Sequence, residues 1–164
     1  MQLEYLVRVS KHLMLKCGDH PPMLYIEPSV GEGIVCVFDD LPATTQEKQL
    51  MMFRVGKNQG KAHPGMHLNH IYFVVEAWYT ILVNGEISGS VSGKNPQKEE
   101  HLIILHRDVA KKESEITSFQ IIRQMDIVDL LQIKREEKGE VIDELLPSFL
   151  DGFVRGCKRE RTHT

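Results

Sequence analysis

The sequence has few cysteines, no apolar run of membrane-spanning length and little net charge. Its 3 cysteines in 164 residues form no C-x-x-C pair, so neither a zinc knuckle nor a disulfide framework is indicated. No uncharged apolar stretch reaches the ~20 residues of a membrane-spanning helix. The formal net charge of -3 gives no electrostatic reason for strong nucleic-acid binding. The N-terminal residues lack the pattern of a signal peptide. We therefore expect a soluble, cytoplasmic protein with reduced thiols, without a strong signal for nucleic-acid binding and without membrane association.

The best-known catalytic motifs are also missing. The sequence has no G-x-S-x-G elbow, no glycine-rich phosphate loop ending in Lys-Ser or Lys-Thr, and no H-E-x-x-H. Hydrophobic residues make up 41% and charged residues 26%, which are ordinary values for a globular domain. These absences argue against the common nucleophilic hydrolases, the P-loop enzymes and the zinc metalloproteases.

What the sequence does contain is one dominant apolar run, residues 70–83, which reads HIYFVVEAWYTILV. Its β-branched and aromatic residues, followed by the Asn84-Gly85 turn signal, predict a central strand. Alternation places one almost wholly apolar set, beginning with Ile71, on the face that we expect in the core. We look for function on the opposite face, because it combines a carboxylate with the only tryptophan. That face carries His70, Tyr72, Glu76 and Trp78.

Patterns elsewhere predict helices, strands and one loop. Apolar spacing and capping signals predict three helices, and Thr44-x-x-Glu47 has the spacing of a capping box. Short β-branched runs predict the strands, although the last run also fits a helix. The helices are expected at about 2–17, from Thr44 to before Gly60, and about 141–154, where Pro147 kinks the last one; the strands at 23–27, 34–38, 101–107, 115–124 and 126–134; and a flexible loop at 85–97.

This order of elements predicts an α+β fold. We expect an antiparallel-rich mixed sheet of about five strands with two to three packing helices. Neither an internal repeat nor a second core is visible in the sequence. Residues 1–156 are therefore predicted to form a single α+β domain, and residues 157–164 a basic, flexible tail.

Three histidines near the central strand suggest a metal site only if they converge. A metal needs two or three ligand atoms directed at one point. His63 and His67 have the spacing of one helix face, but Pro64-Gly65 lies between them and disfavours a helix. We therefore interpret these two and His70 as loop and strand-edge histidines.

Carboxylates offer a second possible site. Glu27, Asp39 and Asp40 lie at the ends of the two short strands, and with Glu76 they would hold a divalent cation if the strands are neighbours. Aspartates are common in turns for backbone reasons, so only Glu76 is unusual. A carboxylate within an apolar strand must find a partner or raise its pKa. The candidate partners are His70, Lys94, Arg107 and Arg123.

Three short segments carry a resemblance. They are His20-Pro21-Pro22-Met23-Leu24, the run FVVEAW at 73–78, and NPQKEE at 95–100 before an apolar strand. Over residues 1–135 the chain resembles a set of uncharacterised prokaryotic proteins. The resemblance implies no known activity. It does imply that His20, the face with Glu76 and Trp78, and the loop at 94–100 cluster in space.

The leading hypothesis is a non-catalytic binding or interaction module of prokaryotic origin, without a cofactor. Its partner would be a protein or a small ligand, and Tyr72 and Trp78 would be its anchors if they are exposed. The binding residues would be His20, Tyr72, Glu76, Trp78 and Lys94. The alternative is a metal-dependent hydrolase or nuclease in which Asp39, Asp40 and Glu76 hold a divalent metal.

Overall fold

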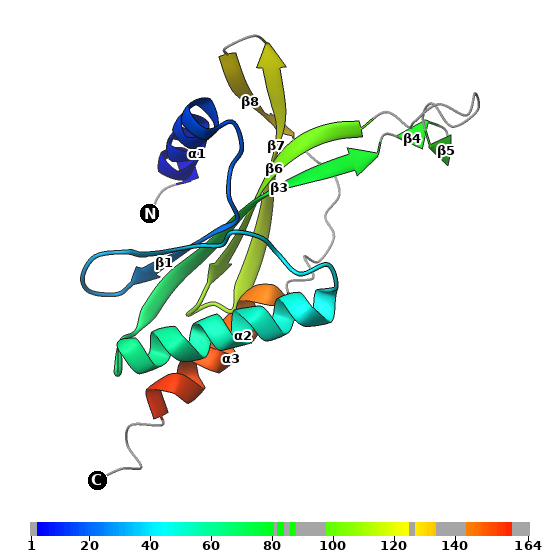
Figure 1. Ribbon diagram of the computed structural model, residues 1–164. Coiled ribbons are helices and arrows are strands. Elements are labelled where there is room, and N and C mark those ends of the chain that lie inside the picture. The colour runs from blue at the N-terminus through cyan, green and yellow to red at the C-terminus, as the bar shows by residue number, and fades with distance from the viewer. Residues whose placement is uncertain are drawn as a thin grey trace. The chain divides into compact units, whose positions relative to one another are not determined.

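The residues that the computed structural model describes form three helices and eight strands (Figure 1). It describes residues 3–80, 82–83, 86–87, 98–124, 127–133 and 144–158, with side chains except those of 78–80, 82, 83, 86, 87, 98 and 133. The helices are α1 (Leu3–Cys17), α2 (Thr45–Ala62) and α3 (Leu145–Lys158). The strands are β1 (Met23–Pro28), β2 (Ile34–Val37), β3 (Leu68–Thr80), β4 (Leu82–Val83), β5 (Glu86–Ile87), β6 (Lys98–Asp108), β7 (Glu113–Gln124) and β8 (Ile127–Ile133).

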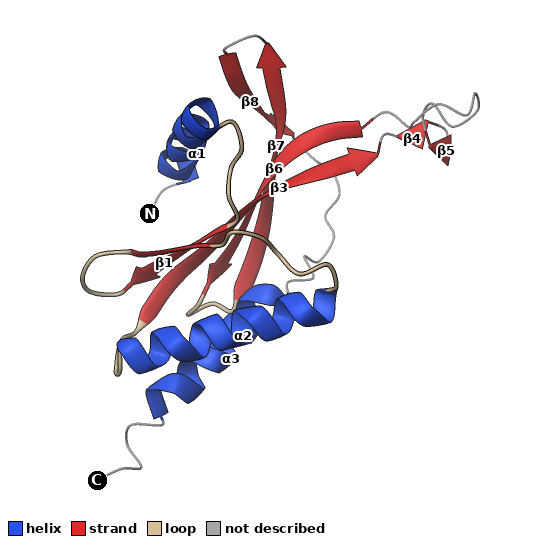
Figure 2. Cartoon of the chain, in the orientation of Figure 1, coloured by secondary structure: helices blue, strands red, loops and turns tan. Residues whose placement is uncertain are grey.

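Six strands form one antiparallel sheet in the order β2-β1-β3-β6-β7-β8 (Figure 2). This confirms the predicted α+β class, with one strand more than the predicted number. Within the ambiguous run at 126–134, the described residues Ile127–Ile133 form a strand, because β8 pairs with β7 and places Leu130 opposite Ile121. Both residues are buried, and this burial selects the strand over the helix. The remaining strands, β4 and β5, form a separate pair.

The chain divides into two compact units, and β3, β6 and β7 contribute residues to both. The prediction that residues 1–156 form a single domain stays a prediction. Unit 1 comprises residues 1–21, 74–104 and 116–138, and unit 2 comprises residues 22–73, 105–115 and 139–164.

In unit 1, α1 is amphipathic as predicted and contacts β8. Leu6, Ser10 and Met14 recur at four-residue intervals and are its buried residues. The helix ends where Gly18 takes a φ of 85° and its N–H donates to the carbonyl of Met14 at 2.9 Å. A glycine in this left-handed conformation is a common helix C-cap, because it ends the helix and changes the direction of the chain.

In unit 2, α2 and α3 lie together on one side of the strands (Figure 1). The predicted capping box begins α2, since the Thr44 side chain accepts from the Glu47 N–H. The expectation that α2 ends before Gly60 is wrong. A Cβ at Gly60 would lie 2.2 Å from the Phe153 carbonyl oxygen of α3. The glycine therefore permits backbone contact between the two helices, and this packing outweighs its low helix propensity.

Further boundaries differ from the predictions. The predicted central strand at 70–83 is wrong at its end, because β3 ends at Thr80 and Leu82 and Val83 form β4, which pairs with β5 outside the main sheet. Within the expected loop at 85–97, Glu86 and Ile87 form β5, and the rest lies outside the described residues. Helix α3 begins at Leu145, later than predicted, which places Pro147 in the first turn, where a missing N–H costs nothing. The helix continues to Lys158, so the first residues of the predicted basic tail are helical. Residues 159–164 lie outside the described part of the chain.

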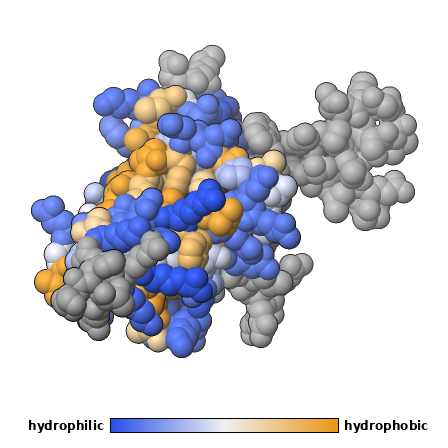
Figure 3. All heavy atoms as spheres, turned by 60° about the horizontal axis from the view of Figure 1, so that its bottom comes forward, coloured by the Kyte–Doolittle hydropathy of each residue, from blue (hydrophilic) through white to orange (hydrophobic). Residues whose placement is uncertain are grey.

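No helix in the described ranges is both long and apolar enough to cross a membrane. Figure 3 turns the lower side of Figure 1 forward and shows polar and apolar side chains intermixed over it. Leu50 of α2 and Val154 of α3 are among the exposed apolar residues of the two helices.

Candidate functional site

Unit 1 gathers four charged side chains, Asp19, Glu76, Glu100 and Arg123, which we call the carboxylate–arginine cluster. Asp19 follows α1, and the other three project from β3, β6 and β7. One oxygen from each carboxylate lies within 4.8 Å of the other two. The acid that sequence patterning left unexplained, Glu76, thus belongs to a charged group assembled from four segments of the chain.

Arg123 holds this cluster together. Its Nε and Nη2 donate to the two oxygens of Glu100 at 2.9 and 2.8 Å, and its Nη1 donates to the Gly18 carbonyl at 2.6 Å. The same Nη2 lies 3.6 Å from Glu76 Oε1 and 3.8 Å from Asp19 Oδ1. Bidentate arginine–carboxylate pairs fix geometry as well as charge. A single guanidinium nitrogen therefore lies within ion-pair distance of all three carboxylates.

His20 joins the cluster through its backbone. Its N–H donates to Glu76 Oε1 at 2.6 Å. The ring is only 4% exposed, and its Nδ1 lies 2.6 Å from the Pro21 carbonyl, so Nδ1 carries the proton and Nε2 the lone pair. Nε2 has no hydrogen-bond partner among the described residues. Burial lowers the pKa of His20, which keeps the imidazole neutral near pH 7.

The environment shifts the pKa values of the two buried carboxyls in opposite directions. Burial raises the pKa of Glu76, which is only 18% exposed, and the hydrogen bond from His20 opposes this effect. The hydrogen bonds from Arg123 lower the pKa of Glu100, and the same bonds raise the pKa of Arg123. Glu100 is thus the paired anion of the cluster. Glu76 binds a proton more readily than an ordinary glutamate does.

The structure brings some of the predicted site residues together. His20 contacts Glu76, and Glu100 ends the 95–100 segment that the resemblance places beside them. Lys94 and the Trp78 side chain lie outside the described part of the structure, so their predicted roles in binding stay predictions. Of the three candidate partners for Glu76 that the structure describes, His70, Arg107 and Arg123, it places Arg123 at 3.6 Å from the Glu76 carboxylate.

The predicted metal ligands Asp39 and Asp40 belong to unit 2, whereas Glu76 belongs to unit 1. Asp40 Oδ1 accepts from the Leu41 N–H at 2.8 Å, the turn role that competes with metal binding for such residues. Among the described residues, the acids that group with Glu76 are Asp19 and Glu100. A role for Asp39 and Asp40 in a metal site stays a prediction.

A second group lies in unit 2, where Tyr25, His70, Tyr72 and His106 form what we call the aromatic–histidine surface. Tyr72 stacks on His106 with ring centroids 4.5 Å apart and planes at 13°. Tyr25 lies 6.3 Å from Tyr72, and His70 lies 5.1 Å from His106. These rings come from β1, β3 and β6, which are neighbours in the sheet. They therefore form a continuous row across three strands.

We expected Tyr72 to act as a binding anchor if it is exposed, and the structure does not meet that condition. The residue is only 5% exposed. Burial, then the charge of Glu27, raises the pKa of Tyr72 to about 12. Val74 on the same face is buried as well, and so are Ile71 and Phe73 on the opposite face, so both faces of β3 are covered along this stretch. Sequence alternation separated an apolar face from a mixed one, but aromatic stacking on the mixed face buries it too.

One hydrogen bond joins the two histidines of this surface. His70 Nδ1 lies 2.9 Å from His106 Nε2. The centroid distance of 5.1 Å exceeds this separation by about two ring radii, so the nitrogens point directly at each other. One nitrogen must donate and the other accept. Burial, then the charge of His70, lowers the pKa of His106, which disfavours a second proton.

Acidic side chains surround these rings. Arg107 Nη1 donates to Ser114 Oγ at 2.9 Å, so these two residues share one face of β6 and β7. Alternation places His106, Asp108 and Glu115 on the other face. The charges of Glu115, Asp108 and Glu27 all favour the protonated form of His106. The face with the aromatic rings therefore carries a negative field.

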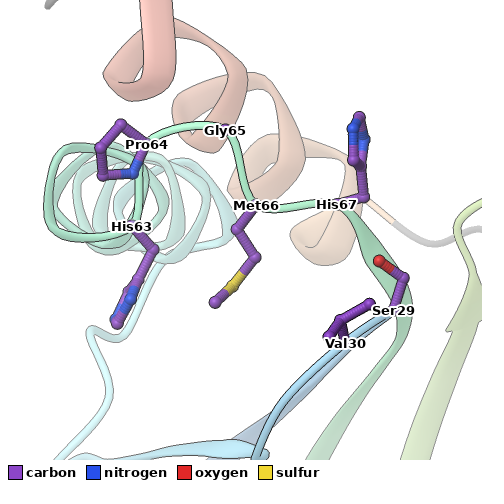
Figure 4. A pocket seen from close by; sticks show the side chains of 7 residues that line it. All are labelled: Ser29, Val30, His63, Pro64, Gly65, Met66 and His67. Carbon is purple, nitrogen blue, oxygen red and sulfur yellow. The ribbon is translucent and has the colours of Figure 1, made fainter.

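The histidines of the loop after α2 do not converge. His63 and His67 line a pocket of about 360 Å³ with Ser29, Val30 and Met66. In Figure 4 the two imidazoles point away from each other. Neither belongs to a group of three potential metal ligands among the described residues. The interpretation of His63 and His67 as loop residues therefore agrees with their arrangement.

Several members of both groups were not predicted. Asp19 adjoins His20, and Glu100 ends the segment NPQKEE at 95–100, but neither position in the sequence predicts an ion pair. Tyr25 and His106 alternate with buried residues in predicted strands, a pattern that would have placed them on one face.

The fold and these sites define an α+β protein with a carboxylate–arginine cluster and an aromatic–histidine surface. No protein-family model, curated protein or solved structure matches the chain.

Proposed function

We propose that this protein is a non-catalytic binding module and that Glu76 is a structural anchor within it. The observation that carries the proposal is the position of Arg123 Nη2, 2.8 to 3.8 Å from an oxygen of all three carboxylates. A divalent cation bound by these oxygens would need each of them at about 2.0–2.6 Å. The guanidinium takes up that space and supplies the positive charge.

The hydrogen bonds of the cluster support the same role for Glu76. Its carboxylate accepts from the backbone of His20, and Arg123 binds the Gly18 carbonyl. These bonds tie the segment after α1 to β3 and β7. Buried polar groups need hydrogen-bond partners. The hydrogen bond from the His20 backbone to Glu76 therefore accounts for a carboxylate within this apolar strand.

A metal-dependent hydrolase is the second candidate, and one observation favours it. Oxygens of Asp19, Glu76 and Glu100 lie within 4.8 Å of one another, an arrangement from which a metal site can be built. In this reading Arg123 would have to move aside, and the base would be the buried imidazole of His20, which follows Asp19 in the chain and whose backbone N–H binds Glu76.

Thermal unfolding with added cations separates the two candidates. The binding-module proposal expects no rise in Tm for the wild-type chain with millimolar Mg²⁺, Mn²⁺, Ca²⁺ or Zn²⁺. Glu76→Gln keeps an oxygen that can accept from His20 and serves as the matched variant. A metal-dependent rise in Tm that Glu76→Gln abolishes would overturn the proposal, because ligands that bind only the folded state stabilise it.

A further inference from the structure

The aromatic–histidine surface continues onto β2, the terminal strand of the sheet. Val35 lies opposite Tyr25, and Val37 lies opposite Met23. Directly opposite residues of an antiparallel pair share a face, so both valines extend the face that carries the rings. They are 51% and 60% exposed. This part of unit 2 thus presents apolar side chains beside an aromatic row.

Three acidic side chains lie around this row, and the charge of Lys111 acts on one of them, Asp108. Glu27 lies on β1 two residues from Tyr25, Asp108 lies on β6 two residues from His106, and Glu115 lies on β7. Glu115 is exposed, and Glu27 and Asp108 are partly exposed. Charges that approach from three different strands act together on whatever contacts the rings between them.

These features select the chemistry of a partner. Arginine and lysine side chains lie over aromatic rings and pair with carboxylates, and their alkyl stems cover apolar surface. An acidic partner or a nucleic acid would meet like charge here. We infer that the aromatic–histidine surface binds an extended, basic segment of a partner protein, with its cationic groups between Tyr25, Asp108 and Glu115 and its apolar groups on the two valines.

This inference rests on the proposed function and names the class of partner. Its test is an NMR titration of the ¹⁵N-labelled full chain with two peptides, acetyl-Val-Arg-Val-Arg-Val-amide and its glutamate counterpart. We expect saturable shifts at the backbone amides of Tyr25, Val35 and His106 with the arginine peptide alone. Raising the salt concentration should weaken them, as expected for exposed charges.

A matched pair of variants tests whether peptide binding depends on the carboxylate of Glu115 or only on net charge. Glu115→Gln should weaken binding of the arginine peptide about two- to fivefold, the range of one exposed ion pair. Asp151→Asn removes the same charge from an exposed position on α3 and should leave the affinity unchanged. Equal loss in both variants would show a net-charge effect and overturn the inference. So would shifts confined to other residues, or equal binding of the glutamate peptide.

The proposed function and the proposed basic partner can be refuted independently of each other. If the arginine peptide does not bind and metals do not stabilise the chain, the basic partner is wrong while the role of Glu76 stands. If metals stabilise the chain through Glu76, the proposed function is wrong whatever the peptide does.

Discussion

Arg123 supplies the positive charge among three carboxylates, and its replacement by glutamine tests that role directly. With the guanidinium gone, the oxygens of Asp19, Glu76 and Glu100 would face each other within 4.8 Å. At that separation each pair of unit charges repels by about 0.9 kcal/mol in water. The water value suits the two pairs that include Asp19, whose side chain is 90% exposed, and it is a lower bound for Glu76 and Glu100, which are 18% and 13% exposed. Three such pairs amount to about 2–3 kcal/mol of lost stability, less what protonation of Glu76 relieves.

A loss of about 2 kcal/mol corresponds to a fall in Tm of roughly 4–8 °C for a chain of this size. Removing Arg123 also leaves space among the three acids. Ca²⁺ or Mg²⁺ should therefore stabilise Arg123→Gln although neither stabilises the wild type. A site with a Kd of about 0.5 mM would recover about 1.4 kcal/mol at 5 mM cation. The assay is thermal unfolding by circular dichroism at constant ionic strength, with and without the cation.

Lys11→Gln is the matched control for this experiment. Lys11 Nζ pairs with Asp129 Oδ1 at 3.1 Å, but both side chains are more exposed than Arg123. Such an exposed pair contributes little to stability. The reasoning is refuted if Arg123→Gln costs no more than Lys11→Gln, or if cations stabilise the wild type as much as the variant.

Three further predictions concern packing, pH and thiol reactivity. Gly56→Ala should destabilise the protein by about 1–3 kcal/mol in urea unfolding, since its Cβ would lie 2.0 Å from a backbone oxygen of α3, whereas Asn58→Ala on the exposed side of α2 should stabilise it by about 0.5 kcal/mol; a neutral Gly56→Ala would contradict the close packing. Because the pKa of His106 is lowered, the folded state binds fewer protons than the unfolded chain below about pH 6.5. The contribution of neutral His106 to the free energy of unfolding is therefore present above that pH and is lost as the pH falls. His106→Gln should flatten the dependence of unfolding free energy on pH between about 7.5 and 5.5, and an unchanged slope would count against it. Iodoacetamide should alkylate the exposed Cys17 before Cys36, whose pKa burial raises; the reverse order, read by mass spectrometry, would contradict this.

Local patterns predicted most of the elements. Helix spacing gave α1, the capping box at Thr44 gave the start of α2, and β-branched runs gave the main strands. These signals depend on neighbouring residues alone. The end of α2 was missed because it depends on α3. Gly60 is unfavourable in an isolated helix, but here it permits contact with a helix more than eighty residues later in the chain.

The sites were less predictable than the elements. Patterning identified Glu76 as unusual, and charge chemistry limited its partners to four side chains. The choice of Arg123 depends on how β3, β6 and β7 are paired, and alternation within one strand does not contain that information. The same limit applies to Tyr72. Its position on the mixed face was predicted, but its burial depends on His106 from another strand.

The contact between α2 and α3 has a consequence for tracing the ancestry of this chain. Gly56 and Gly60 on one helix meet Gly152 and Gly156 on the other, and a Cβ at any of the four would lie 2.0–2.2 Å from a backbone oxygen of the opposite helix. Mutational drift can alter most surface positions of the two helices, but it should leave these four unchanged. Two G-x-x-x-G signatures, each on a helix and separated by a run of strands, thus form a search pattern that outlasts overall sequence identity.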